Sequence, residues 1–164
     1  MQLFTTLSEL TSMLAQRLSS RLPEFSVFLK YAPQYSLTPP ATPGLAVQME
    51  SAAFSPLALG DYLGQEEGET LQGRKVTVEF RLTLILPLEQ AEQGEIYAQN
   101  LFEALLFWDG ADWLELSRLP LEFHRQQQGL LLPFTAKMEV LCLQLQTSGQ
   151  FTSLRLDANW KGEE

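Results

Sequence analysis

The sequence predicts an α+β fold, in which an antiparallel sheet of four to six strands carries two helices on one face. The first observation is strict alternation over residues 75–86. Its apolar positions, which predict the buried face of a long strand, are Val76, Val78, Phe80, Leu82, Leu84 and Leu86. The second is helical spacing in two other segments. Because two helices cannot cover both faces of such a sheet, we expect both on the same face.

The N-terminal half predicts one helix and two strands. Residues 2–22 are expected to form an amphipathic helix that ends at Pro23. Its apolar positions recur every three or four residues: Leu3, Leu7, Leu10, Leu14 and Leu18. Residues 24–32 and 45–54 favour strands, and the proline-rich stretch 33–44 between them predicts a long loop.

The C-terminal half continues with an irregular acidic segment at 55–73, punctuated by glycines, and then the long strand. Residues 89–107 predict the second helix. Its apolar stripe consists of Ala91, Gly94, Ala98, Leu101, Phe102, Leu105 and Trp108. A strand within 113–126, a polar turn, a returning strand at 130–145 and a short strand at 151–156 follow. We therefore expect one domain over residues 1–156 and a polar tail at 157–164.

Composition argues against several classes of partner. The formal net charge is −9 and the basic residues are scattered, which disfavours specific nucleic-acid binding. No apolar run approaches the roughly 18 residues that suggest a membrane span, so we expect no membrane association. The N-terminus also lacks the pattern of a signal peptide, and a cytoplasmic or particle-associated protein is expected.

We expect no enzymatic activity, no metal and no cofactor. The single histidine, His124, lies on the polar side of a strand, where a plain surface histidine is favoured over a histidine–carboxylate base. The single cysteine, Cys142, lies in an apolar strand, which favours a small buried residue and excludes an internal disulfide. Glycine-rich phosphate loops and a nucleophile elbow are missing from the sequence.

Two groups of residues are predicted to contact another subunit. Tyr62 and Leu63 are apolar residues within an acidic segment, where they are able to dock on a neighbour. The strand end at 140–145 is apolar on both faces, so another element or another chain is expected to cover Leu141, Leu143 and Leu145.

Three segments together resemble a known family. They are the run from Ala58 to Gly64 followed by Glu69–Phe80, the passage from Leu86-Pro87 through Ala98–Leu105, and the hairpin from Leu119 to Leu143. This succession is similar to the tail-terminator or tail-completion proteins in tail gene clusters of phages and prophages of Gram-positive bacteria. The resemblance covers about residues 55–145 and is one of strand, loop and helix order.

The resemblance implies a structural subunit of a virion tail, assembled in the host cytoplasm as a homo-oligomeric ring, commonly a hexamer. Such a ring caps the tail tube and meets the head–tail connector, and no catalytic residue is implied. One alternative stays open on the same pattern, a small acidic secretion-type chaperone that dimerises and binds an extended partner segment. A tube or baseplate subunit, which would form stacked rings or fibres, also remains open.

Overall fold

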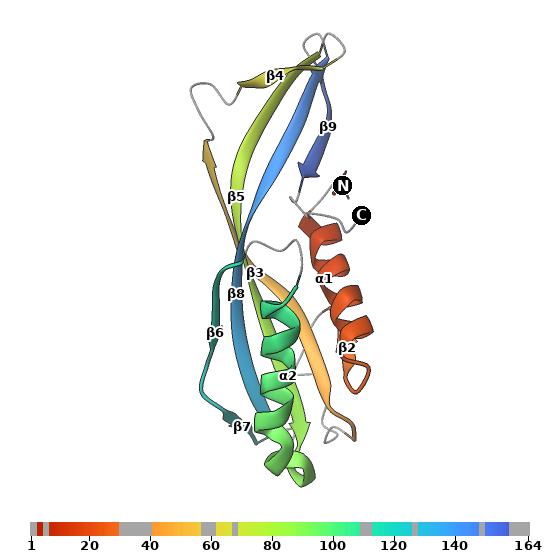
Figure 1. Cartoon of the computed structure of the whole chain (residues 1–164), viewed down its shortest axis with the longest axis vertical. Helices are drawn as coiled ribbons and strands as arrows, with labels where there is room; N and C mark the ends of the chain where they lie inside the picture. The colour runs from red at the N-terminus through yellow and green to blue at the C-terminus, as the bar shows by residue number, and fades with distance from the viewer. Residues whose placement is uncertain are drawn as a thin grey trace.

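The fold is built on one long pair of antiparallel strands, β5 (Glu69–Pro87) and β8 (Gly129–Thr147). Their pairing runs without interruption from Thr70↔Gln146 to Pro87↔Gly129. The computed structural model describes residues 3–4, 7–29, 41–56, 62–66, 69–108, 113–125, 128–147 and 150–157. In Figure 1 the β5–β8 pair runs the whole length of the molecule as its twisted spine.

The other strands flank this pair on both sides. The six-strand path of the sheet is β1-β9-β8-β5-β3-β2, and within the described residues three further strands pair off it. The flanking strands are β1 (Leu3–Phe4), β2 (Ser26–Phe28), β3 (Gly44–Pro56), β4 (Tyr62–Glu66), β6 (Trp113–Arg118), β7 (Glu122–His124) and β9 (Gln150–Asp157). Only β2 and β3 pair in parallel among these described strands. The predicted α+β class is confirmed.

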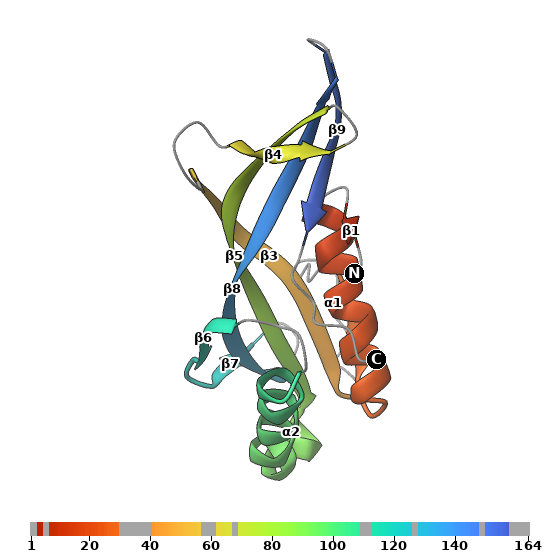
Figure 2. The same cartoon turned by 45° about the horizontal axis from the view of Figure 1, so that its top comes forward.

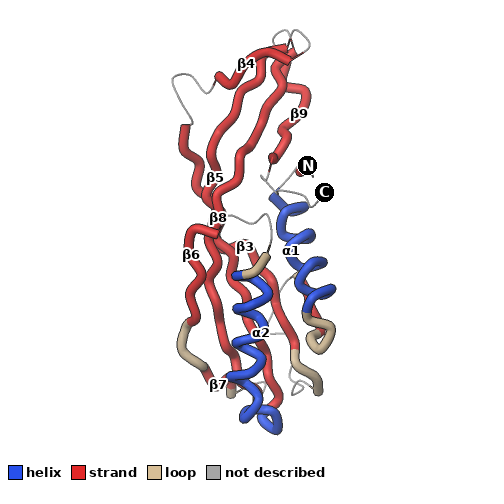
Figure 3. The backbone as a smooth tube through the Cα atoms, viewed as in Figure 1, coloured by secondary structure: helices blue, strands red, loops and turns tan. Residues whose placement is uncertain are grey.

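Two α-helices, α1 (Leu7–Arg21) and α2 (Gly94–Leu106), pack on one face of the sheet. Figure 3 shows both helices along the same half of the sheet. The half that contains β4 and β9 extends beyond them, as Figure 2 also shows after rotation. The sheet therefore has one helix-covered face and one face that no described helix covers.

The core follows from the alternation in β5. All six of its predicted core residues, from Val76 to Leu86, have no exposed surface. Five of them, all except Leu86, belong to a single apolar cluster that also contains Leu10, Leu14 and Leu18 of α1 and Ala98, Leu101 and Leu105 of α2. Because each large apolar side chain buried in this way contributes about 1.5–3 kcal/mol, this cluster is the main stabilising term.

Both predicted helices are confirmed, with corrected starts. Residues 3–4 are strand β1, because they pair with Leu156 and Asp157 of β9 at the far end of the chain. The second helix opens as a 3₁₀ segment, η3 (Leu88–Gln93), with a kink at Gln90. The hydroxyl of Tyr97 donates a 2.7 Å hydrogen bond to Oε1 of Gln93, which supports this irregular first turn.

The segment predicted to be irregular, residues 55–73, is largely strand where the structure describes it. It contains the last residues of β3, all of β4 and the first five residues of β5, and β4 pairs back on β5 from Tyr62↔Gln72 to Glu66↔Glu69. Residues 57–61 and 67–68 lie outside the description. Of the glycines that suggested a loop, Gly64 lies in β4 and Gly73 in β5, where strand pairing holds the backbone.

The strand predicted within 113–126 is two short strands, β6 and β7. Pro120 separates them, since it cannot donate a hydrogen bond to β8. Leu119, at the start of the gap, still donates a 2.9 Å backbone hydrogen bond to the carbonyl of Pro133. The predicted loop at 33–44 and the tail at 157–164 lie almost wholly outside the described residues.

An aromatic contact joins α1, α2 and β6. The Trp108 and Trp113 rings meet edge to face at 6.1 Å, and the Arg17 guanidinium lies 5.2 Å from the centre of the Trp108 ring. Trp113 Nε1 donates a 2.9 Å hydrogen bond to the carbonyl of Leu105 at the end of α2. These two tryptophans are therefore packing residues.

Truncation of one central side chain tests this account of the core. We expect Phe80→Ala to lower the free energy of unfolding by about 3–5 kcal/mol, because it leaves a cavity between the sheet and both helices. Thr77→Ala, on the opposite face of the same strand, is expected to cost less than about 1 kcal/mol. Urea unfolding measures both. An equal loss of unfolding free energy in Phe80→Ala and Thr77→Ala would contradict a core on one face of β5.

Candidate functional site: the uncovered face and edges of the sheet

The face opposite the helices is polar and carries charges on five strands. Its residues are the odd-numbered positions of β5 and β8 and their neighbours on β3, β6 and β7. Its charged members are Glu50, Lys75, Glu79, Arg81, Glu115, Glu122, Lys137 and Glu139. Carboxylates outnumber cations five to three on this surface, which we call the charged face.

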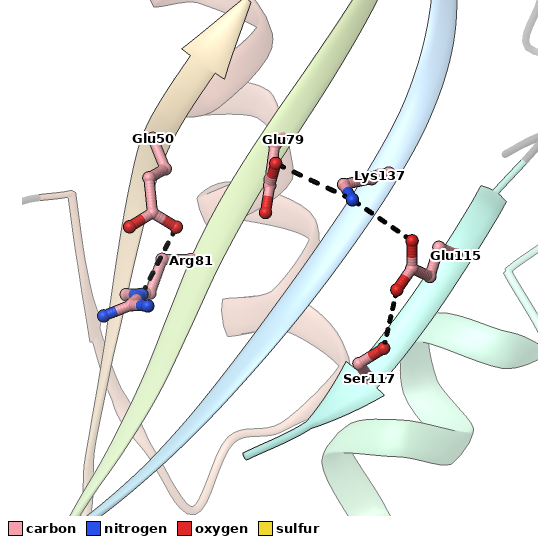
Figure 4. Close-up of polar contacts among 6 residues, drawn as sticks. All are labelled: Glu50, Glu79, Arg81, Glu115, Ser117 and Lys137. Carbon is pink, nitrogen blue, oxygen red and sulfur yellow. Dashed lines mark hydrogen bonds and ion pairs between the residues drawn. The ribbon is translucent and has the colours of Figure 1, made fainter.

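Most of these charges are held in ion pairs across the strands. Lys137 Nζ lies 3.1 Å from Glu115 Oε2 and 3.9 Å from Glu79 Oε2, so it joins β8 to both β6 and β5 (Figure 4). Arg81 Nε lies 3.3 Å from Glu50 Oε2, without hydrogen-bond geometry. Lys75 Nζ lies 2.7 Å from Glu139 Oε1. The charges therefore compensate one another along the sheet.

These contacts fix the protonation states of the central groups. The hydrogen bond that Lys137 donates lowers the pKa of Glu115, and a second one, donated by Ser117 Oγ over 3.1 Å, lowers this pKa further. The same Glu115 contact, with the charges of Glu115 and Glu79, raises the pKa of Lys137. An ammonium that keeps its proton so firmly is a poor base or nucleophile.

A depression of about 300 Å³ lies on this face between β3 and β7. It is lined by Ala46, Gln48, Arg81, Thr83, Leu119, Glu122, Leu131 and Pro133. At this end the same face carries a small buried apolar cluster of Ala46, Ile85 and Leu131, with Phe28 packed against it. The lining offers one guanidinium and one carboxylate among neutral groups, which suits a polar contact better than proton transfer.

Two strand edges are open on opposite sides of the sheet. At the level of Val78 and Leu82 of β5, the sheet has four strands, β6-β8-β5-β3, and the outer edges of β3 and β6 pair with no described strand. Each open edge carries one large exposed apolar side chain, Phe54 on β3 and Leu114 on β6, and each is 59% exposed. The sequence pattern did not indicate these residues, because only long-range pairing reveals an edge.

Each open edge also carries a bulge, at Met49/Ser51 in β3 and at Trp113/Glu115 in β6. A bulge interrupts the row of backbone hydrogen-bonding groups and disfavours unlimited addition of further strands. Leu114 is itself the extra residue of the β6 bulge. Contact at these edges would therefore be made by side chains.

The five residues predicted to form an oligomer interface lie at the end of the sheet beyond the helices. Tyr62 and Leu63 belong to β4, and Leu141, Leu143 and Leu145 to β8. The strand between them is β5, because Tyr62 pairs with Gln72 and Gln72 pairs with Gln144. On its other side β8 pairs with β9, so a strand of the same chain covers this part of its edge. The interface itself stays a prediction.

The residues considered for catalysis lie far apart. His124 ends β7 opposite Gly129, whereas Cys142 pairs with Arg74 near the other end of β8. Thirteen residues of β8 separate these two levels, or roughly 43 Å at 3.3 Å per residue. His124 is half-buried, and its Nδ1 makes no hydrogen bond within the described chain.

In the part of the chain that the structure describes, no three His, Cys, Asp or Glu side chains converge as a metal site would require. Neither described helix combines the length and the apolar composition needed to cross a membrane. No protein-family model and no curated protein matches this chain.

The ion pair at the centre of the charged face predicts a pH dependence. Because the pKa of Glu115 is lowered by folding, its stabilisation is fully present above the unfolded-state pKa and is lost as pH falls through the folded-state pKa. We expect Glu115→Gln to lower the urea midpoint at pH 7 and to reduce the further loss between pH 5 and acid pH. Glu122→Gln, on the same face and without an ion pair among the described residues, is the control. An unchanged acid dependence in Glu115→Gln would contradict the assignment.

Proposed function

We propose that this chain is a structural subunit of a phage or prophage tail, a tail terminator or completion protein that forms a ring on the end of the tail tube. Two kinds of observation support this proposal. One is the resemblance of residues 55–145 to that class of protein. The other, which carries the proposal, is the pair of open strand edges on opposite sides of one sheet, each with an exposed apolar side chain.

Opposite edges favour a ring over a two-fold dimer. A contact between the β3 edge of one copy and the β6 edge of the next is heterologous, and such contacts close into rings when the rotation between copies is right. Phe54 and Leu114 lie at neighbouring levels of the sheet. Phe54 pairs with Val76, which pairs with Val140 of β8, and Leu114 follows Trp113, which pairs with Met138 of β8. The bulges limit this contact to side chains, which disfavours a growing fibre.

The charged face suits the lumen of such a ring. DNA must slide past the wall of a tail without binding to it, and a surplus of carboxylates repels phosphate. The three cations of this face are each engaged by carboxylates of neighbouring strands, so they offer little to a phosphate. The proposed partners are other copies of this chain, the tail tube protein and the head–tail connector protein. The proposed sites of action are the host cytoplasm during assembly and the virion tail.

We further propose that the subunit has no catalytic activity. Glu115 and Lys137 of the charged face stabilise each other's charged form, which lowers the pKa of the first and raises the pKa of the second, and general acid–base catalysis needs a group whose pKa is close to the working pH. Such a face is suited to lining a channel, where its side chains would keep their charges without taking part in a reaction.

Light scattering at increasing protein concentration, followed by electron microscopy with tail tubes, tests the ring. We expect a hexamer, either free in solution or on tube ends, and at least a tenfold weaker assembly in Phe54→Ser and in Leu114→Ser, because each truncation removes one half of the contact. Phe123→Ser is the matched control, since Phe123 is 54% exposed but lies on β7, at the end of the sheet. A stable dimer unaffected by either edge variant would instead favour the secretion-type chaperone and overturn the proposal.

Charge reversal tests the lumen. We expect Glu122→Lys to slow or block DNA passage in tails assembled with this variant, because an unpaired ammonium would bind phosphate as the DNA moves. The double change Gln16→Lys and Ser19→Lys raises the net charge by the same two units on the exposed side of α1 and is the control. Genome delivery by assembled particles is the measurement. Normal delivery with Glu122→Lys would show that this face does not line the channel.

A further inference from the structure

A groove of about 620 Å³ lies between α2 and strands β6 and β8. Its lining is Glu95, Ile96, Ala98, Gln99, Phe102, Glu103, Leu106, Phe107, Arg118 and Phe134. Three of the apolar members are strongly exposed: Ile96 by 61%, Leu106 by 53% and Phe107 by 68%. We call this surface the α2 groove. It lies on the helix-covered side of the sheet and is separate from the charged face.

The fold does not need these exposed side chains. The stripe of α2 that packs on the sheet consists of Gly94, Ala98, Leu101 and Leu105, which are all buried. A helix that rests on a sheet normally presents polar residues to water on its outer side. Exposed apolar residues that gather along one groove, with polar residues at its rim, mark a site of association.

Two carboxylates, Glu95 and Glu103, line the α2 groove together with Arg118, and the segment that supplies both glutamates is acidic. The segment from Leu88 to Phe107 contains Glu89, Glu92, Glu95 and Glu103, all exposed, and contains no lysine or arginine. Glu95 receives two 2.6 Å hydrogen bonds from Arg118 of β6, which neutralises that cation. Arg21 of α1 donates a 3.3 Å hydrogen bond to the carbonyl of Phe107 at one end of the groove.

A second copy of this chain is a poor occupant for an acidic groove. The chain carries a net charge of −9, and four of its cations, Lys75, Arg81, Arg118 and Lys137, already form ion pairs with carboxylates of the same subunit. A two-fold contact through α2 would also place the same four glutamates opposite one another. Charge complementarity therefore requires a basic partner.

We propose that the α2 groove binds a basic amphipathic segment of a different protein, whose apolar side chains lie against Ile96, Leu106 and Phe107 while its lysines or arginines face Glu92 and Glu103. This is a helix-in-groove mode, in which apolar residues spaced three, four and seven apart act as anchors. The site is on a different surface from the open edges, so it does not depend on ring formation or on the proposed tail function.

The test uses synthetic 18-residue helical peptides and the full-length protein. A leucine/lysine amphipathic peptide carries the proposed chemistry, a leucine/glutamate peptide reverses its charge, and a scrambled leucine/lysine peptide keeps its composition without an apolar face. Fluorescence anisotropy of labelled peptides measures binding. We expect the first peptide to bind at least tenfold more tightly than the other two, and its affinity to fall as salt is raised from 50 mM to 500 mM.

Variants distinguish the groove from bulk attraction between opposite charges. We expect Ile96→Ser with Phe107→Ser to weaken binding at least tenfold, whereas Leu121→Ser with Phe123→Ser, which removes apolar residues of similar exposure, leaves it unchanged. We expect Glu92→Gln with Glu103→Gln to weaken binding more than Glu50→Gln with Glu122→Gln, which alters the net charge equally on the charged face. Circular dichroism checks that each variant is folded.

Three results would overturn this proposal. Equal weakening by the two glutamine pairs would reduce the effect to net charge. Unchanged binding after the serine substitutions in α2 would remove the groove as the site. Loss of self-association in Ile96→Ser with Phe107→Ser, in the absence of any peptide, would show that a second copy covers this surface. Failure of the ring test, in contrast, would leave all three readouts intact.

Discussion

The uninterrupted pairing of β5 with β8 is the constraint on which the rest of the molecule depends. Its register from Thr70↔Gln146 to Pro87↔Gly129 decides which side chain points to which face along the whole sheet. A slip of one residue would move Val78, Phe80 and Leu82 from the core to water and place Glu79 and Arg81 under the helices. The transfer of that much apolar surface far outweighs any exposed ion pair, so burial fixes the register. The ion pairs of Lys137 add discrimination, because they form only when Glu79, Lys137 and Glu115 lie side by side.

The two helices then decide which surfaces remain for other molecules. Both pack on the same face, where the T-shaped contact of Trp108 with Trp113 and the guanidinium of Arg17 join α1, α2 and β6. Beyond Ala46, where its pairing with β2 ends, the outer edge of β3 pairs with no described strand, and the outer edge of β6 pairs with none either. The surfaces proposed for assembly, for the channel and for a basic partner are therefore all consequences of placing two helices on one side of a sheet.

The sequence predicted what local periodicity controls and failed where distant segments meet. The alternation of residues 75–86 identified the central strand and its buried face, and three- and four-residue spacing identified both helices. Residues 3–4 extended a helical pattern but form strand β1, since their partners lie at Leu156 and Asp157. Glycines at 60–73 suggested a loop, yet β4 and the start of β5 pair there.

The candidate surfaces likewise depend on contacts between distant segments, which the local sequence pattern does not predict. Ion pairs such as Lys75–Glu139 and Lys137–Glu115 join residues from different strands, so the spacing of charges in the sequence does not predict them. Phe54 and Leu114 are ordinary strand residues by pattern, and only the absence of a further described strand makes them edge residues. The interface predicted from Tyr62, Leu63, Leu141, Leu143 and Leu145 depended on apolar composition, and the structure adds that one end of the sheet brings these five positions onto neighbouring strands.

The net charge of −9 is arranged differently on the charged face and around the α2 groove. On the charged face, cations alternate with carboxylates across the strands, and the surplus is small and spread along the sheet. The segment from Leu88 to Phe107 contains four glutamates and no lysine or arginine, and two of these glutamates, Glu95 and Glu103, line an apolar groove. Even dispersion of charge repels a polyanion without holding any cationic ligand, whereas carboxylates beside an apolar surface attract a segment that supplies both cations and apolar groups. The two surfaces proposed here thus differ in whether their carboxylates lie beside cations or beside exposed apolar side chains.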